Sequence, residues 1–301
     1  MQLNLHRLWI FMCVIDCGGF SAAAEKLYMS QPSVSNQIRQ LEASAGVTLI
    51  DRSGAKVRPT AEGEVLLEYA RRVFLLADEA AAAIQQVAGL KAGRLAVGGT
   101  TTVGTYLLPQ LIAQFRRAHP AISCDIVVGN AVQVTKQLVD GDIGLAVLAG
   151  KPREAHLVTH TILEERLVLV AWPDHVLVDK ALSPSDLRAE TFLIRERGSL
   201  TREQQESALD HWELADSGRA EMWGPETLKQ AAAAGLGITL ISEHAVAREL
   251  ATGVLVALDI AIPLESRPIV VAHRRDRLLS PAERAFRDLL HDTASWPGRI
   301  A

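Results

Sequence analysis

Residues 19–42 decide the N-terminal fold and read GFSAAAEKLYMSQPSVSNQIRQLE. Ser21 is a natural N-cap for a short alanine-rich helix, and Ser30 caps a second helix that carries Pro32 in its first turn. Apolar residues of the second helix recur at helical spacing and predict a buried stripe of Val34, Ile38 and Leu41. Two short helices around a tight turn indicate a helix-turn-helix.

The face of the second helix opposite that stripe carries short hydroxyls, amides and one cation. Such side chains suit the edges of DNA bases and the phosphate backbone. We expect DNA contacts from Ser21 of the first helix and from a set on the second helix comprising Gln31, Pro32, Ser33, Ser35, Asn36 and Arg39. Because an asparagine suits adenine better than guanine, Asn36 favours adenine at the base it meets.

Residues 47–59 predict a wing, a β-hairpin that follows the second helix after Gly46. Its positive charges are Arg52, Lys56 and Arg58. On a short hairpin these charges can lie along the phosphate backbone, which would make binding depend on salt. A solvated hairpin that makes no DNA contact is the alternative.

The sequence resembles the LysR family of transcription regulators in these segments. The match runs through GFSAAA at 19–24, SQPSVS at 30–35 and the residues that follow, to the TAEG at 60–63. Family members often carry a basic residue where this chain has Asn36. The resemblance implies a winged helix-turn-helix DNA-binding domain over residues 1–60, a linker helix over 61–90 and an effector-binding domain over 91–301.

The segment from Thr60 to Leu90 contains no proline and predicts one long helix. Its apolar positions alternate four and three apart, as in a heptad repeat: Leu66, Ala70, Val73, Ala77, Ala80, Ile84 and Val87. Such a stripe cannot bury itself alone, so we expect a homodimer that reads a partly palindromic promoter site, and further assembly to a tetramer. The alternative is a single helix packed on its own body.

The remaining two-thirds of the chain alternates strand and helix patterns, which indicates an α/β fold with mainly parallel sheets. The candidate strands are Ser123–Val128, Ile143–Leu148, Leu167–Ala171, Phe192–Arg195, Ile238–Ile241 and Ile269–Ala272, with a first strand from Arg94. The candidate helices are Leu108–Arg117, Val132–Asp140, Arg202–His211, Glu226–Ala234 and Glu243–Leu250.

The family resemblance extends weakly into this region. It implies two α/β lobes joined by two crossover strands, as in periplasmic binding proteins. With crossovers near 163–165 and 264–266, the first lobe comprises residues 94–163 and 267–301, and the second spans 164–266. An effector would then lie between the lobes.

Open parallel sheets bind ligands at the carboxyl ends of their strands, so the loops there predict the effector site. Hydroxyls and backbone N–H groups at helix starts suit an anion. The expected set is Thr100, Thr101, Thr102, Gly129, Asn130, Arg195, Gly198, Ser199, Thr201 and Glu226. For each hydroxyl the alternative is an ordinary helix cap, and for Arg195 the alternative to an anion contact is an ordinary surface ion pair with the neighbouring Glu196.

Bulk properties narrow the function further. A net charge of −4 argues against a protein that coats nucleic acid nonspecifically. The N-terminus lacks a signal-peptide pattern and no apolar run approaches the roughly 20 residues that span a bilayer, so we expect a cytoplasmic protein with no membrane partner. No nucleophile, metal or P-loop motif favours an enzyme or a cofactor. A transport-type binding protein is the other alternative, and RNA polymerase is an expected partner of a regulator.

Overall fold

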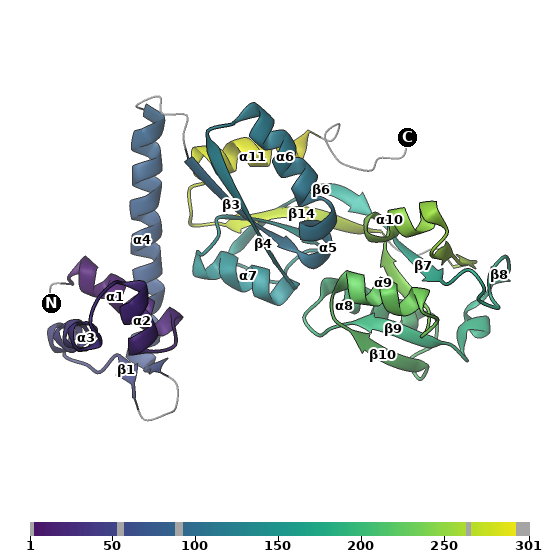
Figure 1. Cartoon of the computed structure of the whole chain (residues 1–301), viewed down its shortest axis with the longest axis horizontal. Coiled ribbons are helices and arrows are strands. Elements are labelled where there is room, and N and C mark those ends of the chain that lie inside the picture. Colours follow the sequence, from purple (N-terminus) through teal and green to yellow (C-terminus); the bar gives the residue numbers. More distant parts are fainter. Residues whose placement is uncertain (1–2, 53–56, 88–92, 263–265, 293–301) are drawn as a thin grey trace. The chain divides into compact units, whose positions relative to one another are not determined.

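The computed structural model describes residues 3–52, 57–87, 93–262 and 266–292 (Figure 1). The chain divides into two compact units, Met1–Ala81 and Ala82–Ala301, and each is described by itself. The wing residue Lys56 and part of the second predicted crossover lie outside the described residues. No single helix in the described ranges is long and apolar enough to cross a membrane, although the bent pair of the first two helices passes that test by length and composition.

The first unit begins with a three-helix module made of α1 (Leu5–Asp16), α2 (Phe20–Lys26) and α3 (Gln31–Ala45). The predicted stripe of α3 is buried in the core of this module. Ser30 caps α3, since its Oγ accepts the Ser33 N–H at 3.3 Å. The prediction that Ser21 caps α2 is wrong: Gly19 is the N-cap and Ser21 is an exposed residue inside the first turn.

The wing is built from two short antiparallel strands, β1 (Ile50–Asp51) and β2 (Arg58–Pro59). Its first strand is shorter than the predicted one from residue 47, because the backbone before Ile50 forms hydrogen bonds outside the β1–β2 pair. The Thr48 carbonyl accepts the Thr60 hydroxyl at 2.8 Å, and the Leu49 carbonyl accepts the Thr60 N–H at 3.0 Å. The Glu42 carboxylate of α3 accepts the Leu49 N–H at 2.9 Å, which ties the wing to the recognition helix.

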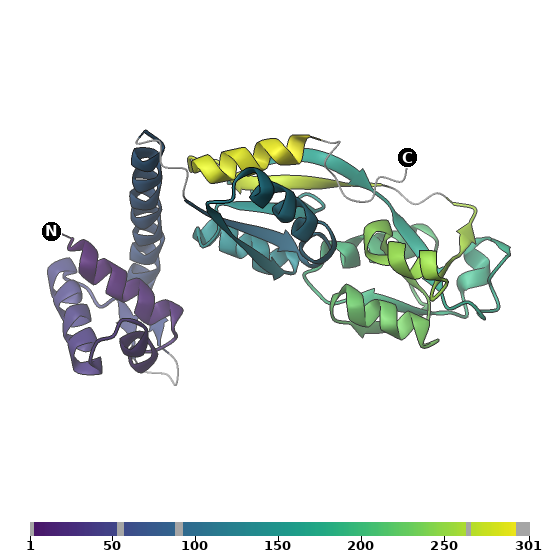
Figure 2. The same cartoon turned by 45° about the horizontal axis from the view of Figure 1, so that its top comes forward.

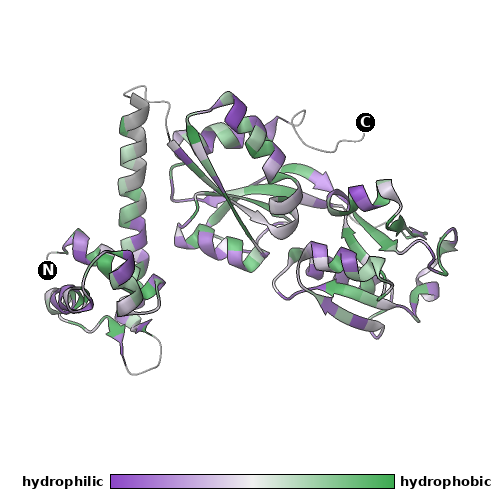
Figure 3. Cartoon of the chain, in the orientation of Figure 1, coloured by the Kyte–Doolittle hydropathy of each residue, from purple (hydrophilic) through white to green (hydrophobic). Residues whose placement is uncertain are grey.

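The long helix α4 (Ala61–Val87) follows the wing. The first predicted heptad positions do not face outward, because Ala70 is fully buried and Leu66 packs on the core of its own module. The exposed apolar stripe consists of Val65, Tyr69, Val73, Leu76 and Ile84, of which Val73 and Ile84 belong to the predicted stripe. Apolar residues therefore recur along the whole helix (Figure 3).

The second unit holds two lobes (Figure 1). The first contains a five-stranded sheet in the order β4-β3-β5-β14-β6. Its strands are β3 (Gly93–Thr100), β4 (Ile122–Gly129), β5 (Leu145–Ala149), β6 (Leu157–Glu165) and β14 (Arg267–Arg274). Its helices are α5 (Thr101–Tyr106), α6 (Leu108–Ala118), α7 (Ala131–Asp140) and α11 (Pro281–His291). Helices α6 and α11 contribute to one apolar core of the sheet, and α7 contributes to another. Helix α11 is the yellow helix in Figure 2.

The second lobe is built around β7 (Leu167–Ala171), β9 (Thr191–Arg195), β10 (Gly218–Met222) and β11 (Thr239–Ser242). Helix α8 (Leu200–His211) contributes to one core of this lobe, and α9 (Gly224–Ala233) and α10 (Glu243–Thr252) contribute to the other. Smaller elements complete the lobe: β8 (Ala181–Leu182), the 3-10 helix η1 (Pro184–Leu187), β12 (Val256–Ala257) and β13 (Asp259–Ile260).

The sheets are mixed, which corrects the prediction of mainly parallel sheets. Strand β3 runs parallel to β4 and β5, and β9 runs parallel to β10. However, β14 runs antiparallel to both of its neighbours, β5 and β6, and β7 runs antiparallel to β11 and β12. The antiparallel pairs arise where the chain passes between the lobes: β6 ends at Glu165 and β7 begins at Leu167, and β14 returns to the first sheet.

Candidate functional site

The outer face of α3 is the first candidate site. With Val34, Ile38 and Leu41 fully buried, the opposite face is left to solvent. Its exposed members are Gln31, Pro32, Ser33, Asn36 and Arg39, while Ser35 is half-buried. Two of these side chains are held within the helix, since Ser33 receives the Ser30 hydroxyl at 2.9 Å and Arg39 Nε donates to the Ser35 carbonyl at 3.4 Å. The face therefore presents hydroxyl, amide and guanidinium groups to solvent.

The two described arginines of the wing differ in their contacts with the rest of the protein. Arg52 forms an ion pair with Glu42 at 3.3 Å and lies 5.1 Å from the Phe20 ring centroid, so its charge is partly shared. Arg58 on β2 is exposed. Sequence reasoning overlooked Tyr28, which is 99% exposed in the turn between α2 and α3 with a left-handed φ of 53°. Its position in the turn between the two helices could have identified Tyr28 as an exposed residue.

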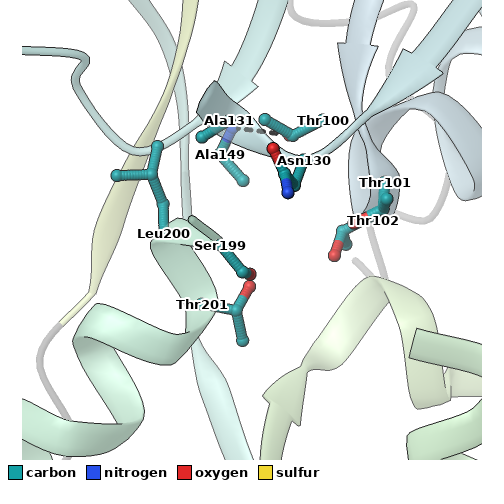
Figure 4. Close-up of a pocket in the computed structure, with 9 residues that line it drawn as sticks. All are labelled: Thr100, Thr101, Thr102, Asn130, Ala131, Ala149, Ser199, Leu200 and Thr201. Atoms are coloured by element: carbon teal, nitrogen blue, oxygen red, sulfur yellow. Dashed lines mark hydrogen bonds between the residues drawn. The ribbon is translucent and has the colours of Figure 1, made fainter. Parts of the chain in front are cut away.

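A pocket between the lobes of the second unit is the second candidate site (Figure 4). It encloses about 200 Å³, including the part open to solvent, and is lined by Thr100, Thr101, Thr102, Asn130, Ala131, Ala149, Ser199, Leu200 and Thr201. These residues come from the ends of β3 and β5 and from the starts of α5, α7 and α8. Hydroxyl and amide groups dominate the lining. The Thr100 hydroxyl accepts the Ala149 N–H at 3.1 Å, which joins two of these loops.

The structure brings six of the predicted effector residues together in this pocket: Thr100, Thr101, Thr102, Asn130, Ser199 and Thr201. Gly129 and Gly198 do not line it. Gly198 has a φ of +83°, and a Cβ there would lie 3.1 Å from Val132 Cγ2, so a glycine lets the lobes approach each other at this edge of the pocket. Asn130 caps α7 in a reciprocal capping box with Gln133, so the helix-cap alternative also applies to it.

Arg195 lies outside the pocket lining and is already neutralised. Its Nε and Nη2 donate to the two oxygens of Glu196, both at 2.7 Å, and the two side chains are 1% and 2% exposed. The ion pair with Glu196 is therefore buried and does not lie at the surface. Burial raises the pKa of Glu196, but the hydrogen bonds from Arg195 and from the Gly224 N–H outweigh burial and hold this pKa below its usual value. Arg195 Nη2 also donates to the Thr101 hydroxyl at 2.8 Å, which links the lobes.

Glu226 also lies outside the pocket lining and joins the lobes elsewhere. It accepts the Tyr106 hydroxyl from the first lobe and pairs with Lys229 at 2.9 Å. Lys229 is nearly buried, pairs with Glu249 at 2.8 Å and lies 4.9 Å from the Tyr106 ring centroid. Burial raises the Glu226 pKa, but the bonds from Tyr106 and Lys229 hold it low. Burial and the bond to Glu226 raise the pKa of Tyr106 well above its usual range.

Sequence reasoning missed a buried cluster next to the pocket. Arg267 is 3% exposed; its Nε donates to Glu165 Oε1 at 2.6 Å and its Nη1 to the Thr201 hydroxyl at 3.0 Å. The Ser242 hydroxyl bonds the other oxygen of Glu165. These groups meet because Arg267 pairs directly with Glu165 in the register of β14 and β6. Nothing in the local sequence indicates that pairing, since the two residues are 102 positions apart.

These two sites define the class of the protein. A helix-turn-helix with a polar outer helix face, joined in one chain to a two-lobed unit with a polar pocket, is the arrangement of a ligand-responsive transcription regulator.

Comparisons with known proteins identify the family. Residues 5–64 match the model of the bacterial regulatory helix-turn-helix protein, lysR family, and residues 88–295 match that of the LysR substrate binding domain. The chain belongs to the LysR family of transcription regulators, which bind DNA and sense effectors and are not enzymes. The confirmed resemblance thus covers both units.

The chain is similar along its length to curated regulators. It is 37% identical to the HTH-type transcriptional regulator CfxR of Cupriavidus necator, over 99% of this chain and 94% of that protein. It is 32% identical to the RuBisCO operon transcriptional regulator of Allochromatium vinosum, over 98% of each. The regulatory domain of Synechocystis PCC6803 CcmR, solved in complex with 2-PG, is 29% identical with a TM-score of 0.59, covering 66% of this chain and 96% of that one.

Proposed function

We propose that this regulator controls promoter binding through a small anionic metabolite that binds in the pocket between the lobes. The observation that carries the proposal is the pocket lining, in which side chains from both lobes present hydroxyl and amide groups to one space. A ligand that contacts both lobes favours the arrangement in which they are close. It shifts the protein only through its unequal affinity for the two arrangements.

The chemistry of the lining favours an anion. Helices α7 and α8 both begin at the pocket, and their first N–H groups and partial positive charge suit negatively charged oxygens. The relative CcmR was solved with 2-PG, which makes 2-PG the first compound to test on this chain.

The exposed face of α3 is proposed to enter the major groove of double-stranded promoter DNA. Gln31 and Asn36 offer amides to base edges, and Arg39 offers a cation to a guanine or a phosphate. Arg58 and Lys56 of the wing are proposed to contact the phosphate backbone. Because one relative is named as a RuBisCO operon regulator, the promoter of a RuBisCO operon is the first DNA target to test.

The exposed apolar stripe of α4 supports pairing with a second copy of this chain. Val65, Tyr69, Leu76 and Ile84 are each more than half exposed, which is costly for a helix that stays alone in water. A dimer would present two α3 helices to a two-fold symmetric DNA site. We propose that dimers assemble further to a tetramer and that the regulator contacts RNA polymerase at a promoter in the cytoplasm. Sedimentation of Leu76→Glu should show a smaller species than the wild type.

The effector proposal is tested with Thr102→Val and Ser199→Ala in one chain. Both residues line the pocket, and neither belongs to the first unit. The variant should keep its gel shift with promoter DNA but lose the response to 2-PG. Thr105→Val is the matched control, because Thr105 is an exposed threonine of the same helix that does not line the pocket. An unchanged response in the double variant would count against the pocket.

The DNA proposal is tested with Gln31→Ala and Arg39→Ala. Each should weaken specific promoter binding by about 1–3 kcal/mol while ligand binding persists. Arg153→Ala is the control, because Arg153 is an exposed cation of the second unit. Equal losses for Arg39→Ala and Arg153→Ala would show that only overall charge matters.

A further inference from the structure

Arg267 is a buried cation with an unused donor. Its Nε is committed to Glu165 and its Nη1 to the Thr201 hydroxyl, while its Nη2 is buried and has no hydrogen-bond partner among the residues that the structure describes. A buried donor without an acceptor is costly, and such groups are rare in native proteins. The unused Nη2 therefore calls for an acceptor that arrives with a ligand.

The bond to Thr201 places the guanidinium beside the pocket. Nη1 and Nη2 form one edge of a planar fork whose donors are fixed in direction. Nη1 already donates to Thr201 Oγ1, and Thr201 lines the pocket. Figure 4 shows the hydroxyl of Thr201 next to that of Ser199 in the pocket. The Nη2 group belongs to the same guanidinium whose Nη1 bonds the Thr201 hydroxyl, so it lies close to this pair of hydroxyls.

Arg195 makes a useful comparison, because it is also a buried arginine near the pocket. It gives both Nε and Nη2 to Glu196, so a single carboxylate occupies its side-on edge. In contrast, Glu165 receives only the Nε of Arg267, and its second oxygen is bonded by Ser242. Arg267 therefore keeps more donor capacity for an incoming anion.

We propose that Arg267 is the cationic contact for the acidic group of the effector, with an oxygen of that group accepting from Nη2 beside the hydroxyls of Thr201 and Ser199. This inference rests on the proposed function and names the charged group that the pocket lining lacks. Glu165 ends β6 and Arg267 begins β14, so the contact acts where the chain passes between the lobes.

The test measures binding of 2-PG, inorganic phosphate and acetate to the full-length chain by calorimetry. Arg267→Gln should weaken binding of an anion about 10- to 100-fold, the usual effect of losing one hydrogen bond to a charged group. Arg267→Lys should recover part of the loss. Arg166→Gln is the matched control, because Arg166 is an exposed arginine next to Glu165 and should leave binding unchanged.

A second variant guards against a trivial loss through misfolding. Arg267→Gln leaves Glu165 as an uncompensated buried carboxylate, whereas Arg267→Gln with Glu165→Gln removes both charges and should fold. If the wild type binds none of the three anions, the proposed function fails together with this inference. If the wild type binds an anion and the folded double variant binds it equally well, only the role of Arg267 is refuted.

Discussion

The buried pair of Arg195 and Glu196 gives the sharpest stability prediction. Glu196→Gln keeps the size of the side chain and removes its charge. The side chain of Arg195 is only 1% exposed, and two of its bonds to Glu196 are 2.7 Å long. The substitution therefore leaves a guanidinium inside the protein without a compensating carboxylate.

The size of the effect follows from that burial. Removing one partner of a buried ion pair typically costs about 3–5 kcal/mol, because the remaining charge cannot be solvated. The Gly224 N–H loses a charged acceptor as well. Replacing both partners, with Arg195→Gln and Glu196→Gln, should recover most of the loss, because no buried charge is left.

Urea unfolding followed by tryptophan emission measures the effect, since Trp172, Trp212 and Trp223 belong to the second lobe. The pH dependence adds a second readout. The Glu196 pKa is held below its ordinary value of 4.5, so its contribution to stability is full above that pH and is lost as the pH falls through the folded-state value. The difference between wild type and Glu196→Gln should therefore narrow in acid.

Glu203→Gln is the control for this experiment. Glu203 pairs with Arg153 at 3.2 Å, but the two side chains are 53% and 89% exposed. An exposed pair of this kind is worth less than about 1 kcal/mol. If Glu196→Gln costs no more than Glu203→Gln, burial of the Arg195 pair does not govern its strength and the reasoning fails.

Three further predictions concern single side chains. Gly63→Ala should destabilise the first unit by about 1–3 kcal/mol, seen as faster hydrogen exchange in α4, because a Cβ would lie 2.1 Å from the Leu49 carbonyl oxygen; exposed Glu62→Ala should not. Tyr28→Gly should slow exchange in that unit through a gain of up to about 1 kcal/mol, since glycine adopts the left-handed φ of 53° without strain; faster exchange would contradict this. The wild type should lose stability as the pH rises above 10.0, because Tyr106 ionises there in the unfolded chain but stays protonated in the folded chain. Tyr106→Phe should remove this loss, and an identical alkaline stability profile in the variant would contradict the prediction.

The helix-turn-helix was predictable because its signals are local. The apolar spacing of α3, the Ser30 cap and Pro32 act within a few residues of one another, and the structure agrees with them. The cap of α2 was not predictable from Ser21 alone, since the N-cap lies two residues earlier at Gly19 and the helix starts at Phe20. The first predicted positions of the α4 stripe were wrong, because whether Leu66 faces inward depends on the three-helix module against which it packs.

The pocket was predictable in part for a similar reason. Hydroxyls and amides at the ends of strands and starts of helices mark loops that meet at one edge of a sheet, and five of the predicted hydroxyl residues and Asn130 do meet. The charged residues were harder to place. Arg195 and Glu226 belong to loops that the sequence predicted to surround the effector, but they bond Thr101 and Tyr106 of the other lobe. Sequence spacing carries no information about such pairs.

The same hydroxyls that line the pocket also join the lobes, and this double role suggests how a ligand acts. Thr101 accepts from Arg195, and Thr201 accepts from Arg267. A ligand that accepts from these hydroxyls adds contacts only when both loops are close, so its binding energy is available only to the closed arrangement. A tenfold preference for that arrangement corresponds to about 1.4 kcal/mol, which one or two hydrogen bonds supply. We therefore expect the sensor to respond without a large rearrangement of its cores, because two of the polar contacts already lie beside the proposed ligand site.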